Sequence, residues 1–100
     1  MAIWFISRHE GAIEWMQQQS ISVDHWATHL DLEAIQPGDI VIGILPIAIA
    51  AEVIALGARY FALILPQRAS ERGQEHSCAS MIERGAVLQE FLVTAVNRKG

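Results

Sequence analysis

Cysteine is almost missing from this sequence, since Cys78 is the single one among 100 residues. One cysteine cannot form a disulfide within the chain, and no cysteine pair has the spacing of a zinc site. A reducing cytosol is therefore the expected environment. His25 and His29 look like a metal pair, but on a strand they would stand about 13 Å apart. We expect neither a metal nor a cofactor.

Basic residues are also few. Seven Lys and Arg are outnumbered by eleven Asp and Glu, which gives a formal net charge of −4. Such a chain has no bulk electrostatic attraction to long nucleic acid, so any anion-binding site must be local. Two of the basic residues, Arg98 and Lys99, lie in the C-terminal tail. The arginines left for the body of the domain are Arg8, Arg59, Arg68, Arg72 and Arg84.

No apolar run is long and unbroken enough to predict a membrane span. The most apolar stretch, "IVIGILPIAIAAEVIALG" (40–57), contains Gly43, Pro46 and Glu52. It therefore predicts a strand followed by a helix. The N-terminal "MAIWFISRHEG" lacks the basic start and long apolar core of a signal peptide. We expect a cytoplasmic protein that makes no contact with a membrane.

Apolar residues, by contrast, are abundant. They make up 52% of the chain, and charged residues make up only 18%. A single small domain needs fewer, so the composition predicts a second buried surface, most simply a homodimer interface. The helix expected over 46–56 is apolar on nearly every side apart from Glu52, whereas a helix covering a sheet usually has a polar outer stripe. We expect this helix at or near the interface.

The hydrophobic pattern alternates between strands and helices. It predicts strands over 2–6, 23–30, 39–45, 59–65 and 86–96, a helix ending near residue 19, and further helices over 46–56 and 74–84. This alternation indicates a single α/β domain with a mostly parallel sheet of about five strands and helices on both faces. The connection between the second and third strands is too short for the usual helical crossover. We expect one strand pair there to depart from the pattern.

Three short segments follow the carboxyl ends of predicted strands, where open α/β sheets bind ligands. These segments are 7–9, 45–46 and 66–68. His29 and Asp31 follow the second strand and are candidates to join them. Arg59 begins a strand, so it should lie at the opposite end of the sheet and is excluded.

Two of these segments favour an anion. The first helix should present backbone N–H groups beside Arg8 and His9, and a helix N-terminus attracts negative charge. The second helix begins after Leu45, which cannot cap it, so the N–H groups of Ile47 and Ala48 are without an obvious side-chain partner. Gly43 permits close approach nearby. Two adjacent helix ends at one crevice would form a phosphate-sized site.

The candidate residues follow from this reading. The catalytic candidates are Ser7, Arg8 and His9. The substrate-binding candidates are Gly11, Gly43, Leu45, Pro46, Ile47, Ala48, Gln67 and Arg68. The alternatives stay open. Ser7 and Glu10 have the S-x-x-E spacing of a capping box, and capping is then their whole role. Arg8 and His9 are incidental residues of the first turn exposed to solvent, and water or another loop satisfies the second helix.

Three blocks of the sequence resemble a family of small CRISPR-associated proteins of about this length. The blocks are "SRHEGAIEW", "HLDLEAIQPGDIVIGILPIAIAAEV" and "GARYFALIL", and together they span most of residues 5–65. The family pattern is SRHxGAxEW followed by GDxVxGxLPxxxAAEVxxxGARY. The blocks keep both the order and the spacing of that pattern.

The resemblance implies a ring nuclease of type III CRISPR systems. Such enzymes cut cyclic oligoadenylate second messengers, chiefly cyclic tetra-adenylate, and switch off the effectors that the messenger activates. They resemble Rossmann-like sensor domains and typically act as metal-free dimers. In a metal-free mechanism the ribose 2′-OH attacks its own 3′-phosphate, so Arg8 would stabilise charge on the phosphate and His9 would carry a proton. The alternatives are a module that binds the ring without cutting it, and a structural domain with protein partners only.

Overall fold

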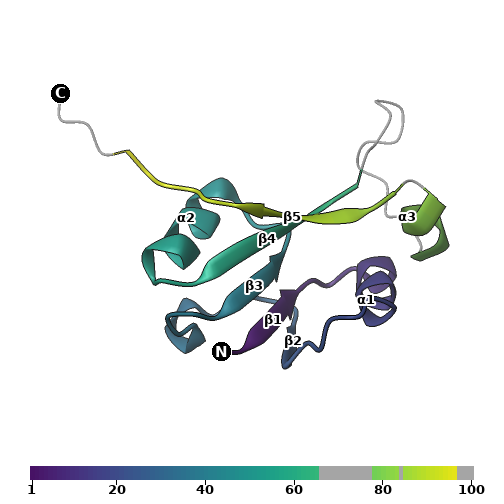
Figure 1. The fold of residues 1–100 in the computed structure, drawn as a ribbon, viewed down its shortest axis with the longest axis horizontal. Coiled ribbons are helices and arrows are strands. Elements are labelled where there is room, and N and C mark those ends of the chain that lie inside the picture. The colour runs from purple at the N-terminus through teal and green to yellow at the C-terminus, as the bar shows by residue number, and fades with distance from the viewer. Residues whose placement is uncertain (66–77, 84, 97–100) are drawn as a thin grey trace.

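The computed structural model of the chain describes residues 1–65, 78–83 and 85–96. It contains a five-stranded sheet with the strand order β2-β1-β3-β4-β5 (Figure 1). In chain order the elements are β1 (Ile3–Ile6), α1 (Glu10–Gln17), β2 (His25–Ala27), the 3-10 helix η1 (Leu32–Ala34), β3 (Ile40–Gly43), α2 (Ile47–Ala55), β4 (Arg59–Ile64), α3 (Cys78–Glu83) and β5 (Val87–Phe91).

The sheet is mostly parallel, as the alternating pattern predicts. β1 pairs in parallel with both β2 and β3, and β3 pairs in parallel with β4. β5 runs antiparallel to β4. The expectation of a mostly parallel α/β sheet of about five strands is confirmed.

The departure from parallel pairing lies elsewhere than expected. β2 and β3 are not neighbours, because they pair with opposite edges of β1. The connection between them crosses β1 with η1 in place of an α-helix. The antiparallel pair is β4 with β5, an edge strand of a kind often added to a parallel sheet.

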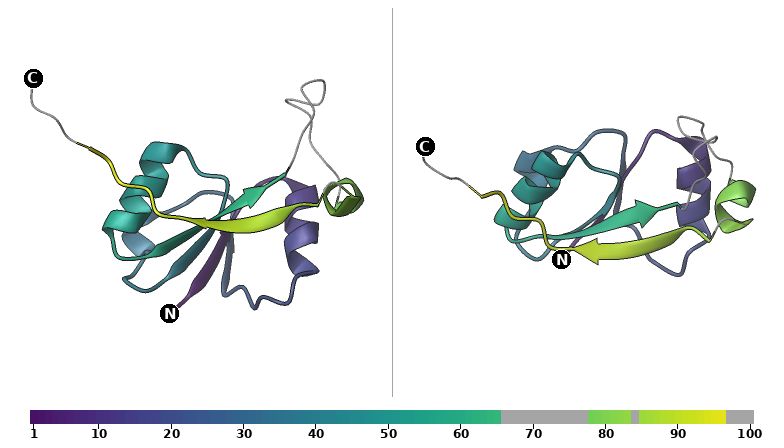
Figure 2. Two further views of the ribbon diagram at one scale, coloured as in Figure 1. Left: turned by 45° about the horizontal axis from the view of Figure 1, so that its top comes forward. Right: turned by 90° about the horizontal axis from the view of Figure 1, so that it is seen from above.

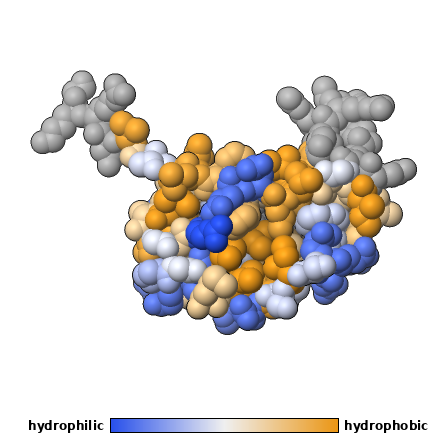
Figure 3. Space-filling model, viewed as in Figure 1, coloured by the Kyte–Doolittle hydropathy of each residue, from blue (hydrophilic) through white to orange (hydrophobic). Residues whose placement is uncertain are grey.

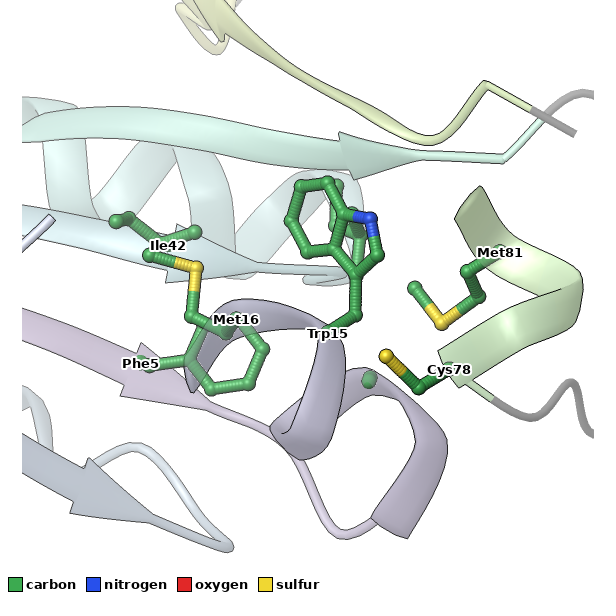
Figure 4. Close-up of a cluster of buried hydrophobic side chains, with 8 residues drawn as sticks. Phe5, Trp15, Met16, Ile42, Cys78 and Met81 are labelled. Atoms are coloured by element: carbon green, nitrogen blue, oxygen red, sulfur yellow. The ribbon is translucent and has the colours of Figure 1, made fainter. Parts of the chain in front are cut away.

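Helices cover both faces of the sheet (Figure 2). α1 and α3 lie side by side on one face, where Trp15 and Met16 of α1 pack with Phe5, Ile42 and Met81 (Figure 4). α2 covers the other face together with η1. The buried cluster on this face of the sheet includes Ile35, Val41, Ala50, Val53 and Tyr60. Val41 and Ile42 are neighbours in β3, so this central strand is buried on both faces.

Several elements are shorter than the pattern predicts. The strand expected over 23–30 is limited to β2, and the strand expected over 86–96 to β5. The helix expected over 74–84 is represented by α3, and residues 66–77 and 84 lie outside the described part of the chain. No helix within the described ranges is long and apolar enough to cross a membrane.

A buried carboxylate joins the amino ends of the central strands. Asp39 is 4% exposed and accepts hydrogen bonds from the backbone N–H groups of Ala2 and Gln36, each at 3.0 Å, and from the Trp4 indole N–H at 3.1 Å. The backbone N–H groups of Gln36 and Ala2 lower the pKa of Asp39 below its usual value, against the opposing effect of burial. Asp39 thus stabilises the sheet at the end opposite the strands' carboxyl termini.

Candidate functional site

A crevice of about 560 Å³ lies at the carboxyl ends of the first three strands. It sits where the chain turns from one side of β1 to the other, because β2 and β3 flank β1 in the sheet. Such a switch point is where open α/β sheets bind their ligands. The sequence candidates that line it are Ser7, Arg8, His9, Gly43, Leu45 and Pro46.

The side of the crevice formed by the segments after β1 and β2 is held by a hydrogen bond at the carboxyl ends of these strands. The Ser7 N–H donates to the Ala27 carbonyl oxygen at 3.0 Å. This bond continues the parallel ladder one residue past the end of β1, to the last residue of β2. As a result the segment after Ala27 leaves the sheet beside Ser7, and His29 lines the same crevice as Arg8 and His9.

The junction of β1 and α1 is not a capping box. α1 begins at Glu10, and its N-cap is His9. The Ser7 hydroxyl accepts the His9 backbone N–H at 3.1 Å, two residues along the chain. Ser7 lies too far before the helix to reach the N–H of its third residue, so the prediction of a capping box is wrong.

The opposite wall, from β3 to α2, is fixed by Tyr60 of β4. The Tyr60 hydroxyl accepts the Leu45 N–H at 3.1 Å and donates to the Gly43 carbonyl oxygen at 3.3 Å. A Cβ on Gly43 would lie 2.6 Å from the Ile6 carbonyl oxygen, so the backbone would have to shift. The close approach that this glycine permits is therefore between β1 and β3.

The electrostatics of the crevice favour an anion. Arg8 is exposed, and its guanidinium has no ion-pair partner among the residues that the structure describes. α1 and α2 both begin at the crevice, and no side chain caps the first turn of either helix. Both helix N-termini therefore offer backbone N–H groups. Glu10, in the first turn of α1, is not among the lining residues.

Other candidates lie away from the crevice lining. Gly11 lies in α1 but does not line it. Ile47 and Ala48 do not line it with their side chains: Ile47 is 77% exposed, and Ala48 borders a separate groove. The prediction concerned their backbone N–H groups, and these belong to the first turn of α2. Gln67 and Arg68 lie outside the described residues.

Residues that the sequence did not single out complete the lining. They include Thr28, Leu30, Leu32, Ile44 and Ile49. Ile44 and Ile49 lie beside candidates of the segment after β3. Thr28, Leu30 and Leu32 require the strand order, because their segment meets the others only when β2 and β3 flank β1. The candidate Asp31 does not line the crevice, since its carboxylate accepts the Glu33 N–H at 3.0 Å and caps η1.

Charged groups at the amino end of the sheet are already paired. Arg59 begins β4 and forms a bidentate ion pair with Glu90 of β5, with Nε–Oε2 and Nη2–Oε1 distances of 2.7 and 2.9 Å. As predicted from its place at the start of a strand, Arg59 lies at the amino end of the sheet, opposite the crevice. No cluster of three or more potential metal ligands occurs among the described residues.

The fold and the crevice define a Rossmann-like α/β protein with a candidate anion site at its switch point. Residues 4–94 match the model of a family described as "Putative CRISPR-associated protein (Cas_VVA1548)". The chain belongs to that CRISPR-associated family. Comparisons with curated proteins and with solved structures gave no match.

Proposed function

We propose that the protein is a metal-independent ring nuclease that cleaves cyclic tetra-adenylate and so ends signalling in a type III CRISPR system. The observation that carries this proposal is the crevice, which brings Arg8, His9 and the N-termini of α1 and α2 together. Membership of a CRISPR-associated family supports it. So does the resemblance of residues 5–65 to ring nucleases.

The chemistry needs three things from the protein. The ribose 2′-hydroxyl must be held in line with the bond to the leaving 5′-oxygen. Negative charge on the phosphate must be stabilised, which suits the guanidinium of Arg8 and the N–H groups of two helix ends. A proton must leave the 2′-oxygen, and the imidazole of His9, which lines the crevice together with Arg8, would accept it. The products are linear diadenylates with a 2′,3′-cyclic phosphate.

Two copies of the chain suit this ligand better than one. A crevice of about 560 Å³ has the size of a site for a single drug-sized ligand. Cyclic tetra-adenylate contains four nucleotides and has symmetry that matches a two-fold axis. A homodimer that brings two crevices together would contact the whole ring, and a two-fold interface is the commonest kind in oligomers.

The direct test is an incubation of the protein with labelled cyclic tetra-adenylate in the presence of EDTA. We expect linear product with a cyclic phosphate end. Bound but uncut ring would instead identify a non-catalytic binding module. Neither binding nor cleavage would leave a structural domain with protein partners. Cleavage that stops in EDTA and returns with added manganese or magnesium would contradict the metal-free mechanism.

A further inference from the structure

His29 lines the crevice from the segment after β2, whereas Arg8 and His9 line it from the segment after β1. The Ser7 N–H to Ala27 carbonyl bond, at 3.0 Å, sends the segment after β2 alongside the segment after β1. Thr28, His29 and Leu30 line the crevice on that side. Two imidazoles, from two separate loops, therefore border one candidate anion site.

No other contact accounts for the position of His29. The structure records no hydrogen bond, ion pair or ring contact for its imidazole among residues 1–65, 78–83 and 85–96, and it is exposed. His25, four residues earlier, differs in this respect. Its ring stacks on Trp4 with the ring centroids 4.1 Å apart, at the start of β2 and away from the crevice.

Cleavage by in-line 2′-OH attack requires two proton transfers on opposite sides of the phosphorus. The proton of the 2′-hydroxyl must leave as the O2′–P bond forms. The 5′-oxygen must gain a proton as the P–O5′ bond breaks, because an alkoxide is a poor leaving group. One imidazole cannot reach both oxygens at once, so a single histidine leaves one transfer without a partner.

We propose that His29 is the second proton-transfer residue of this site. The proposal rests on the proposed ring nuclease function. His29 and His9 divide the two transfers: one accepts the 2′-hydroxyl proton, and the other donates a proton to the 5′-oxygen. The electron pair of the broken P–O5′ bond stays on that oxygen, which leaves as a 5′-hydroxyl. Arg8 holds the phosphate between the two histidines.

The test compares His29→Ala and His9→Ala with His25→Ala as a matched control. Single-turnover cleavage and equilibrium binding of cyclic tetra-adenylate are measured for each. We expect His29→Ala to bind the ring as the parent does and to cut it about 10²–10⁴-fold more slowly, the usual range for general acid–base catalysis. His25→Ala should cut at the parental rate, because its ring lies outside the crevice.

A second substrate separates proton transfer from a merely structural role. In this ring, sulfur replaces the bridging 5′-oxygen, and a thiolate leaves without needing a proton. If each histidine carries out one of the two proton transfers, this substrate restores the cleavage rate of one histidine variant and not of the other. Rescue of His29→Ala identifies His29 as the donor to the 5′-oxygen. If only His9→Ala is rescued, His29 is the acceptor of the 2′-hydroxyl proton, and unchanged equilibrium binding of the ring by His29→Ala separates that role from a structural one, which would weaken binding.

Each result bears on a different claim. If the parent cuts and His29→Ala cuts equally fast, His29 is not a proton carrier, and the ring nuclease function stands without it. If the sulfur substrate rescues both variants or neither, the division of the two transfers is wrong. If the parent cuts no ring at all, the proposed function has failed, and the role of His29 falls with it.

Discussion

At the scale of the residue, charge distinguishes the two ends of the sheet. The carboxyl ends of the strands carry Arg8, which has no ion-pair partner in the described part of the chain. At the amino ends, Arg59 is paired with Glu90, and Asp39 accepts three hydrogen bonds. Among its described residues, this acidic protein thus keeps at the crevice a cation without an ion-pair partner, where a phosphate would meet it.

Replacing Arg8 should affect binding and cleavage together. Its charge meets the phosphate in both the ground state and the transition state, so Arg8→Ala should weaken both. Arg8→Lys should restore only part of the loss, because an ammonium group cannot reproduce a planar two-pronged donor. Equilibrium binding and single-turnover cleavage at equal folded concentration measure this. If Arg8→Ala binds and cuts normally, the site is not at the junction of β1 and α1.

Replacing Asp39 should affect stability in a way that depends on pH. Asp39→Asn places an amide N–H₂ where the carboxylate accepts N–H groups, which should cost about 1–3 kcal/mol of unfolding free energy near pH 7. The pKa of Asp39 is below its ordinary value of 3.8 in the folded chain. Its contribution is therefore complete above pH 3.8 and is lost as the pH falls through the lower, folded-state pKa.

Denaturant unfolding of the parent and of Asp39→Asn over a range of pH measures this. The gap between the two proteins should be largest near neutral pH and should narrow in acid. A gap that stays constant down to acid pH would show that the charge of Asp39 contributes nothing to stability.

At the scale of the element, each wall of the crevice is fixed by a contact from outside its own loop. The wall at β2 depends on a backbone bond to Ser7, and the wall at α2 depends on the hydroxyl of Tyr60. Tyr60 is buried in β4, far along the sequence from the loop that it holds. The shape of the site therefore depends on sheet pairing as well as on its own residues.

Removing the Tyr60 hydroxyl should loosen the β3–α2 connection. Tyr60→Phe keeps the buried ring but leaves the Leu45 N–H without its acceptor, which should cost about 1–2 kcal/mol of unfolding free energy and weaken ring binding. Trp4→Phe is the matched control, because it removes a half-buried donor at the opposite end of the sheet. It should lower stability without weakening binding. Equal loss of binding in both variants would show that only global stability matters.

The sequence predicts the part of the fold that depends on local pattern. We could predict β3 from its apolar, β-branched run, and the segments after β1 and β3 from where those strands end. Both predictions depend only on the hydrophobic pattern and the turn residues of neighbouring positions. The direction of β5 cannot be predicted in this way, because its antiparallel pairing with β4 depends on the path of the chain after β4. Likewise the role of Ser7 depends on the exact first residue of α1. Leu30 joins the site only through strand order, which no local pattern specifies.

At the scale of the whole molecule, apolar side chains remain exposed. Ile44, which lines the crevice just before α2, is 71% exposed, and Ile47, the first residue of α2, is 77% exposed. Val87, Phe91 and Leu92 are exposed along β5 and just after it. Figure 3 shows apolar residues over much of the face that carries β4 and β5. Single exposed apolar residues are ordinary, but so many in a small chain favour an interface with a second copy.

The last prediction concerns that second copy. We expect the protein to be a dimer at micromolar concentration, with the start of α2 in or near the interface. Ile47→Glu should then shift sedimentation towards the monomer, because a charge would be buried against the partner without a counterion. It should also weaken binding of cyclic tetra-adenylate if two crevices hold one ring. Ile82→Glu is the matched control, since Ile82 is 55% exposed on α3, on the opposite face of the sheet from α2. A parent that sediments as a stable monomer would exclude the dimer. If Ile47→Glu and Ile82→Glu dissociate the dimer equally, the interface does not lie at α2.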